Sequence, residues 1–160
     1  MKRPPFISTD ERLMTKKPFS SASLSFEGGI RTYDTARALD SVAIDEEDSL
    51  FFYLIMLHFF PDWHQYECYT SVSKNDWHKI LARWEFLSGL DDFDTFIETA
   101  CGLDYANNTV KDKKALYFVN HNADRLWETR GKERMLYENF RRWCEMQFKK
   151  RYKYITIFGF

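Results

Sequence analysis

Residues 73–89 read SKNDWHKILARWEFLSG, and this stretch gives the clearest indication of the fold. Ser73 followed by Asp76 resembles a capping box, with Asp in the place of the usual Glu. Gly89 is of the residue type that commonly ends helices. The stretch therefore predicts an amphipathic helix that packs one face against a core. That face consists of Trp77, Ile80, Leu81, Trp84 and Leu87.

A second helix is predicted before it, around the apolar run LFFYLIML at residues 50–57. The run continues to Phe60 and meets Pro61, which cannot extend a helix. It is far shorter than the roughly 20 residues of a membrane span, so it predicts a fully buried helix. Carboxylates suit the positive end of a helix dipole. The predicted helix therefore begins at the acidic cluster Asp45, Glu46, Glu47 and Asp48.

A third, shorter helix is predicted within residues 91–102, with acidic residues at its start and Gly102 at its end. Its apolar residues recur at helical spacing, which indicates one buried face. That face consists of Phe93, Phe96, Ile97 and Ala100.

The C-terminal half mixes helix and strand signals. Residues 103–114 are polar and predict a surface loop, whereas ALYFV at 115–119 predicts a buried strand. Asn122 is a suitable cap for a long helical stretch with a kink or break at Gly131. The terminal YKYITIFGF is rich in aromatic and β-branched residues and predicts a strand. The core face of the long helix is expected to contain Leu136, Phe140, Trp143 and Gln147, with Tyr137, Cys144 and Phe148 beside it.

The N-terminal part completes the predicted architecture. Residues 1–22 predict a loosely ordered arm ahead of a single globular domain at 23–160. LSFEGGIRTY predicts a hairpin that turns at residues 27–29, because glycine adopts the positive φ of such turns. Residues 63–72 fit either a helical turn or a strand. The sequence thus predicts a mainly helical α+β domain of four to five helices. Its small antiparallel sheet includes an N-terminal hairpin and a C-terminal strand.

The composition is that of a globular protein of one-domain size, with 160 residues of which 44% are hydrophobic. Its three cysteines are widely spaced and form no CxxC pair, which favours a reducing cytoplasm over a disulfide framework. Neither a signal peptide nor a membrane partner is expected. Aromatic residues make up 18% of the chain, which fits either an aromatic-rich core or aromatic residues at a binding surface.

Charge is strongly segregated although the net charge is only −1. Residues 41–110 carry 3 Lys and Arg against 13 Asp and Glu, a net charge of −10. Residues 111–160 carry 13 against 6, a net charge of +7. Such asymmetry bears on partners and long-range fields rather than on the fold.

No motif for nucleophilic catalysis, phosphate binding or dinucleotide binding occurs, so no catalytic residue and no cofactor is predicted. His121 with Asp124 and Arg125 is the nearest approach to an acid–base site, although a histidine at a helix start is commonplace. Four possible metal ligands fall within twenty-one residues but lack the paired spacing of zinc sites, so no metal is predicted. They are His58, His64, Cys68 and His78.

The basic C-terminal part supports one alternative function, the binding or processing of nucleic acid. Much of its charge is expected to be paired along one helix, where residues of alternating sign follow at three- or four-residue spacing. These are Arg134, Glu138, Arg141, Glu145 and Lys149. Only the KKRYK segment at 149–153 remains as a basic cluster.

The acidic middle is harder to explain by local structure. Capping and the helix dipole need one or two carboxylates at a helix start, and both predicted starts carry more. Complementary charge favours a cationic partner. The sequence therefore predicts a non-enzymatic protein that binds a basic protein, such as a bacterial inhibitor or immunity protein that neutralises a cationic toxin, for example a nuclease. The predicted binding residues are Asp45, Glu46, Glu47, Asp48, Asp91, Asp92, Asp94 and Glu98.

Overall fold

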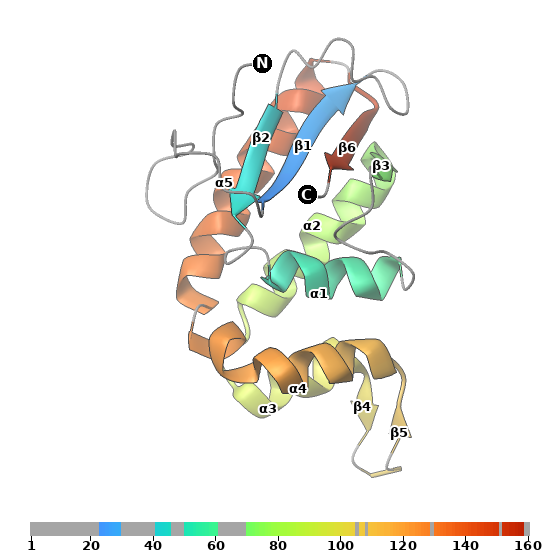
Figure 1. The fold of residues 1–160 in the computed structure, drawn as a ribbon, viewed down its shortest axis with the longest axis vertical. Coiled ribbons are helices and arrows are strands. Elements are labelled where there is room, and N and C mark those ends of the chain that lie inside the picture. The colour runs from blue at the N-terminus through green and yellow to red at the C-terminus, as the bar shows by residue number, and fades with distance from the viewer. Residues whose placement is uncertain are drawn as a thin grey trace.

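A computed structural model describes residues 23–29, 41–45, 50–60, 70–104, 106–107, 109–128, 130–150 and 152–158. The described residues form five helices, a four-stranded antiparallel sheet and a small hairpin, which confirms the α+β class (Figure 1). The helices are α1 (Leu50–Phe59), α2 (Lys74–Ser88), α3 (Phe93–Cys101), α4 (Lys113–Glu128) and α5 (Arg130–Lys149). The strands are β1 (Ser23–Gly29), β2 (Ser41–Asp45), β3 (Thr70–Ser73), β4 (Leu103–Asp104), β5 (Thr109–Val110) and β6 (Tyr154–Phe158).

The main sheet joins the two ends of the described chain. Its strand order is β2-β1-β6-β3, so the C-terminal strand lies between β1 and β3. Phe26 stands opposite both Val42 and Ile157, and Val72 stands opposite Ile155. Residues opposite one another in a ladder share a face of the sheet. The register thus builds one apolar face, whose buried members are Phe26, Val42, Ile44, Val72, Ile155 and Ile157.

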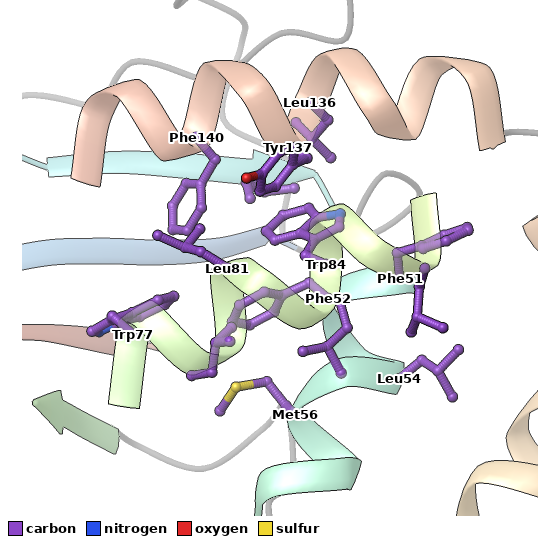
Figure 2. Close-up of a cluster of buried hydrophobic side chains, with 14 of the residues drawn as sticks. Phe51, Phe52, Leu54, Met56, Trp77, Leu81, Trp84, Leu136, Tyr137 and Phe140 are labelled. Carbon is purple, nitrogen blue, oxygen red and sulfur yellow. The ribbon is translucent and has the colours of Figure 1, made fainter. Parts of the chain in front are cut away.

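Helices α1, α2 and α5 pack against this sheet and enclose an aromatic core (Figures 1 and 2). Phe140 of α5 is its centre, with ring centroids 4.7 Å from Phe26, 5.6 Å from Trp77 and 5.6 Å from Trp84. Trp77 donates its indole N–H to the carbonyl oxygen of Ile155 at 3.1 Å, which ties α2 to β6. The core thereby absorbs much of the unusual aromatic content.

One carboxylate enters this core. Glu133, at the start of α5, is only 3% exposed. Its Oε1 accepts a hydrogen bond from the indole N–H of Trp84 at 3.2 Å. A buried carboxylate needs such donors because it has lost its hydration. This bond fixes the start of α5 against α2.

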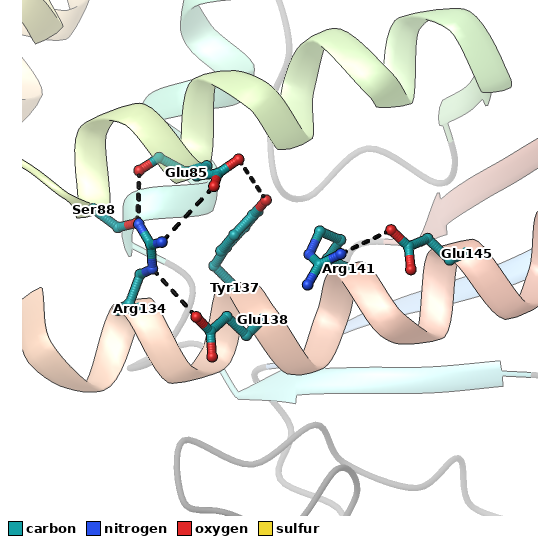
Figure 3. A network of polar contacts seen from close by, with 7 residues as sticks. All are labelled: Glu85, Ser88, Arg134, Tyr137, Glu138, Arg141 and Glu145. Carbon is teal, nitrogen blue, oxygen red and sulfur yellow. Dashed lines mark hydrogen bonds and ion pairs between the residues drawn. The ribbon is translucent and has the colours of Figure 1, made fainter.

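At the edge of the core, a polar network joins α2 to α5 around Glu85 (Figure 3). The Tyr137 hydroxyl donates to Glu85 Oε2 at 3.1 Å, and the Arg134 guanidinium donates to the Glu85 carbonyl at 3.3 Å. Burial, followed by the nearby Glu85 charge, raises the pKa of Tyr137 to about 12. Arg134 also pairs with Glu138 at 3.4 Å. Because such exposed pairs contribute only about 0–1 kcal/mol each, the network chiefly orients the two helices.

Helix α2 and helix α3 have the expected ends. The Ser73 side chain accepts a hydrogen bond from the Asp76 backbone N–H at 3.3 Å, and α2 stops at Gly89. Asp92 caps α3, which ends at Gly102 in the left-handed conformation. The expected core face of α5 is also confirmed, since Leu136, Phe140, Trp143 and Gln147 are all at most 2% exposed.

Several local predictions were wrong. Residues 115–119 belong to α4 rather than to a strand, and Asn122 lies inside that helix, where its side chain donates to the Phe118 carbonyl. Buried Ala115 and Val119 stand four residues apart, which is a helical spacing. Residues 103–104 and 109–110 pair as the β4–β5 hairpin within the expected loop. A short apolar run fits either a helix or a strand, and at 115–119 tertiary packing favours the helix.

The expected turn at residues 27–29 was also wrong. These residues continue β1 and pair with β6, with Gly28 opposite Ile155. The antiparallel partner next in the chain is β2, so the N-terminal strand pair exists but its connection lies at 30–40, outside the described residues. Of residues 63–72, which fit either a helical turn or a strand, 70–72 are strand and 63–69 lie outside the described residues. The proposed arm at 1–22 lies outside the described residues.

Among the described helices, none is both long and apolar enough to cross a membrane. The apolar helix α1 has 10 residues, and six of them are buried in the core.

Two glycines provide a matched test of the backbone. Gly102 has φ of +62°, and a Cβ built there would lie 2.8 Å from Lys111 Cβ. Gly102→Ala is expected to lower the free energy of unfolding by about 1–2 kcal/mol because a side chain is strained in this conformation. Gly131 is helical, and a Cβ added to it would have no neighbouring atom within 4 Å, so Gly131→Ala should be neutral or stabilising by up to about 1 kcal/mol. Urea unfolding of both variants measures the difference, and equal effects would contradict this account.

Candidate functional site

The second acidic cluster lies at the start of α3, at the end of the molecule away from the main sheet (Figure 1). Asp91, Asp92 and Asp94 are exposed, and Glu98 is half-buried one turn further along. The helix dipole favours carboxylates at this position. The structure therefore places these four predicted residues on one short helix and its preceding loop.

Asp92 has a structural role within this cluster. Its Oδ2 accepts hydrogen bonds from the Thr95 hydroxyl at 2.6 Å and the Thr95 backbone N–H at 2.9 Å. These two bonds, the hydroxyl first, lower the pKa of Asp92. Asp92 thus remains charged at lower pH than an ordinary aspartate while it caps α3. Capping accounts for the Asp92 carboxylate. Asp91 and Asp94 add negative charge beyond the one carboxylate that the cap requires.

Helix α4 runs antiparallel to α3 and brings a further acidic residue to the same end. Phe93 at the start of α3 contacts the Trp127 ring near the end of α4, with centroids 5.3 Å apart. At the opposite end, the backbone N–H of Asp112 donates to the Cys101 carbonyl at 3.0 Å. Glu128 follows Trp127 and is exposed. We call Asp91, Asp92, Asp94 and Glu128 the acidic end; sequence reasoning missed Glu128 because only the packing of α4 on α3 brings it there.

An exposed aromatic residue lies close to the acidic end along the chain. Phe86, in the last turn of α2, is 55% exposed. Five residues separate it from Asp92, so the two lie at most about 20 Å apart. Its exposure could be predicted, because position 86 falls outside the helical face formed by Trp77, Trp84 and their neighbours.

The first acidic cluster is only partly described. Asp45 is the last residue of β2, so the expectation that α1 starts there was wrong; α1 begins at Leu50 with no acidic residue in its first turn. Glu46, Glu47 and Asp48 lie outside the described residues. The start of α1 does lie against α3, since the Phe51 and Phe96 rings are 5.4 Å apart.

The two possible metal ligands that the structure describes, His58 and His78, are not part of a metal-binding cluster. His58 is exposed at the end of α1 beside the Phe59 ring, and His78 is exposed on α2 beside Phe148. Partial desolvation by its neighbours, followed by the Arg83 charge, lowers the pKa of His58 even though its side chain reaches solvent. His64 and Cys68 lie outside the described residues. In the described part of the chain, no three His, Cys, Asp or Glu residues converge as metal ligands would.

The remaining candidates for catalysis are the buried cysteines and His121, and each has a place in the fold that explains it without catalysis. Cys101 and Cys144 are fully buried, as expected for Cys144 from its position on the core face. His121 lies inside α4, and its Nδ1 is 2.8 Å from the Tyr117 carbonyl oxygen. The sequence placed His121 before a helix start with Asp124 and Arg125 beyond it. In the structure all three occupy the same exposed helix surface.

The basic C-terminal part is partly paired, as predicted. Arg134 pairs with Glu138, and Arg141 pairs with Glu145 at 2.9 Å. In the KKRYK segment, Lys149, Lys150 and Lys153 are exposed, and residue 151 lies outside the described part.

The fold and this surface together define an α+β protein with exposed acidic residues at the end formed by α3 and α4. No family model matches the chain, and no curated protein and no solved structure matches it significantly.

Proposed function

We propose that this chain is a non-enzymatic binding protein whose acidic end covers a basic protein surface. The observation that carries the proposal is the antiparallel packing of α3 and α4, which adds exposed Glu128 to Asp91, Asp92 and Asp94. Grouped carboxylates raise the local negative potential, which steers a cationic partner and favours it over other proteins.

The aromatic residue Phe86 completes this surface. Interfaces combine a desolvated aromatic centre with a charged rim, and a half-exposed Phe in the last turn of α2 is suited to the first role. We include Glu46, Glu47 and Asp48 in the proposed surface on the basis of their charge alone, and the start of α1, which follows them in the chain, contacts α3. Asp45 and Glu98 belong to the same proposed surface.

The partner that best fits this surface is a cationic toxin such as a nuclease. Its active site must attract polyanions, so an acidic surface competes for the same positive field. In this proposal the chain is an inhibitor or immunity protein of a bacterium.

The test is co-expression with any toxin that is encoded beside this protein's gene, followed by measurement of binding at several salt concentrations. The double variant Asp94→Asn/Glu128→Gln should weaken binding at least about 10-fold, mainly through a slower association rate. Phe86→Ala should weaken it through faster dissociation.

A matched control removes two carboxylates elsewhere, in Asp76→Asn/Glu145→Gln, and leaves the Asp92 cap intact. This control should bind within about twofold of the parent, as its residues lie outside the acidic end. Equal losses in both double variants would refute the acidic end as the binding surface. Failure to bind or to protect the host would refute the inhibitor role.

A further inference from the structure

The exposed face of α4 forms a second surface, unrelated to the acidic end. Its buried side carries Ala115, Val119 and Leu126. On its exposed side, Lys113, Tyr117 and His121 follow one another at four-residue spacing. Residues at this spacing lie one above the other on a helix, about 6 Å apart along its axis. The three side chains therefore form a continuous stripe.

The aromatic part of this stripe is a contacting pair of exposed rings, Tyr117 and His121. Tyr117 is 68% exposed, the highest value among the large apolar side chains described. Its ring lies against the His121 imidazole, with centroids 4.1 Å apart and planes at 34°. The 2.8 Å contact between His121 Nδ1 and the Tyr117 carbonyl holds the imidazole in place. The pair presents a pre-oriented π surface to solvent.

Cationic side chains gather at one end of the stripe. Lys111, Lys113 and Lys114 are exposed, and the first turn of α4 holds no acidic residue. Asp112 is half-buried, and its Oδ1 accepts the Ala115 backbone N–H at 3.0 Å. Asp104 lies near Lys111 and offsets part of its charge. The first two turns of α4 are thus net positive.

Positive charge beside an exposed pair of aromatic rings matches one class of ligand. Unpaired bases have π faces that stack on aromatic side chains, and their phosphates pair with lysine. Duplex DNA hides those faces, and a carboxylate-rich protein lacks them. We propose that the Lys113–Tyr117–His121 face of α4 binds single-stranded nucleic acid.

The acidic end does not prevent such binding. Because α4 has 16 residues, its two ends lie about 24 Å apart, well beyond the Debye length of roughly 8 Å at physiological salt. Glu128 lies at the far end of the helix, whereas Asp124 lies one turn from His121 and is followed by the exposed Arg125. The proposal is therefore independent of the proposed binding of a basic protein.

The test is fluorescence anisotropy with labelled oligothymidine and oligouridine of about 20 nucleotides, at about 50 mM salt. The parent should bind both single strands more tightly than a duplex of the same length. Tyr117→Ala should weaken binding about 10-fold, whereas Tyr117→Phe, which keeps the ring, should retain it. Lys111→Gln/Lys113→Gln should also weaken binding and flatten its salt dependence.

The matched control Lys149→Gln/Lys153→Gln removes two lysines from the C-terminal basic segment. It should leave affinity unchanged. A loss confined to this control would assign nucleic-acid binding to the C-terminal segment, the alternative drawn from the sequence, and would overturn the proposal. The absence of binding, equal binding of duplex, full affinity in Tyr117→Ala or equally effective competition by polyglutamate would also overturn it.

Discussion

Replacing Phe140 with Ala is expected to lower the free energy of unfolding by about 4 kcal/mol. Phe140 is fully buried and its ring contacts Phe26, Trp77 and Trp84, so truncation removes contacts from α2, α5 and the sheet at once. Since small domains have roughly 5–15 kcal/mol of stability, this loss is a large fraction of the total. Urea unfolding should show a lower midpoint with an unchanged slope.

The matched control is Phe86→Ala, which removes the same side chain from a position that is 55% exposed. It should change stability by no more than about 0.5 kcal/mol. If Phe140→Ala proves too unstable to purify, Phe140→Leu should still be measurably less stable than Phe86→Leu. Similar losses at positions 86 and 140 would contradict the packing described for α5.

Cys101 and Cys144 are expected to react with a disulfide reagent far more slowly in the native protein than in the unfolded chain. Both are fully buried. Burial, followed by nearby Asp112, raises the pKa of Cys101 to about 11, and burial raises that of Cys144 well above its usual value. For Cys101, the raised pKa alone makes the reactive thiolate fraction at about pH 8 roughly 100-fold smaller than in the unfolded chain. Exclusion of the reagent slows the reaction further.

The measurement uses the Cys68→Ser variant, which leaves only these two thiols, with and without urea. Rapid native labelling would contradict their burial.

The same pKa shifts predict that stability depends on pH. Thiols in the unfolded chain ionise above about pH 9 while the folded ones stay protonated, so the unfolded state loses protons first. Stability should therefore be unaffected at lower pH and fall as pH rises through this range.

Much of the helical structure was predictable because its signals are local. The apolar spacing of α2, the Ser73 cap and the Gly89 end all lie within seventeen residues, and each depends on neighbours one turn away. The same holds for α3 between Asp92 and Gly102. The acidic cluster at the start of α3 could likewise be recognised from the sequence.

Predictions failed where the deciding contacts are distant in the chain. Gly28 and Gly29 are typical of a turn, yet they lie in a central strand because β6, more than 120 residues later, pairs with them. ALYFV at 115–119 fits a strand by composition, and packing on α1 and α3 makes it helix. That error concealed Tyr117, whose exposure follows from its position opposite Ala115 and Val119.

The sequence alone determined where charge accumulates: at residues 91–94, and in the three lysines around position 113. Only the tertiary structure decided which of these charged residues lie at the same end of the molecule. The antiparallel packing of α4 on α3 brings Glu128 beside the acidic cluster and carries the lysines to the opposite end. The physical reason is that helical periodicity depends on residues three or four apart, whereas a surface is assembled by contacts between segments that the sequence separates.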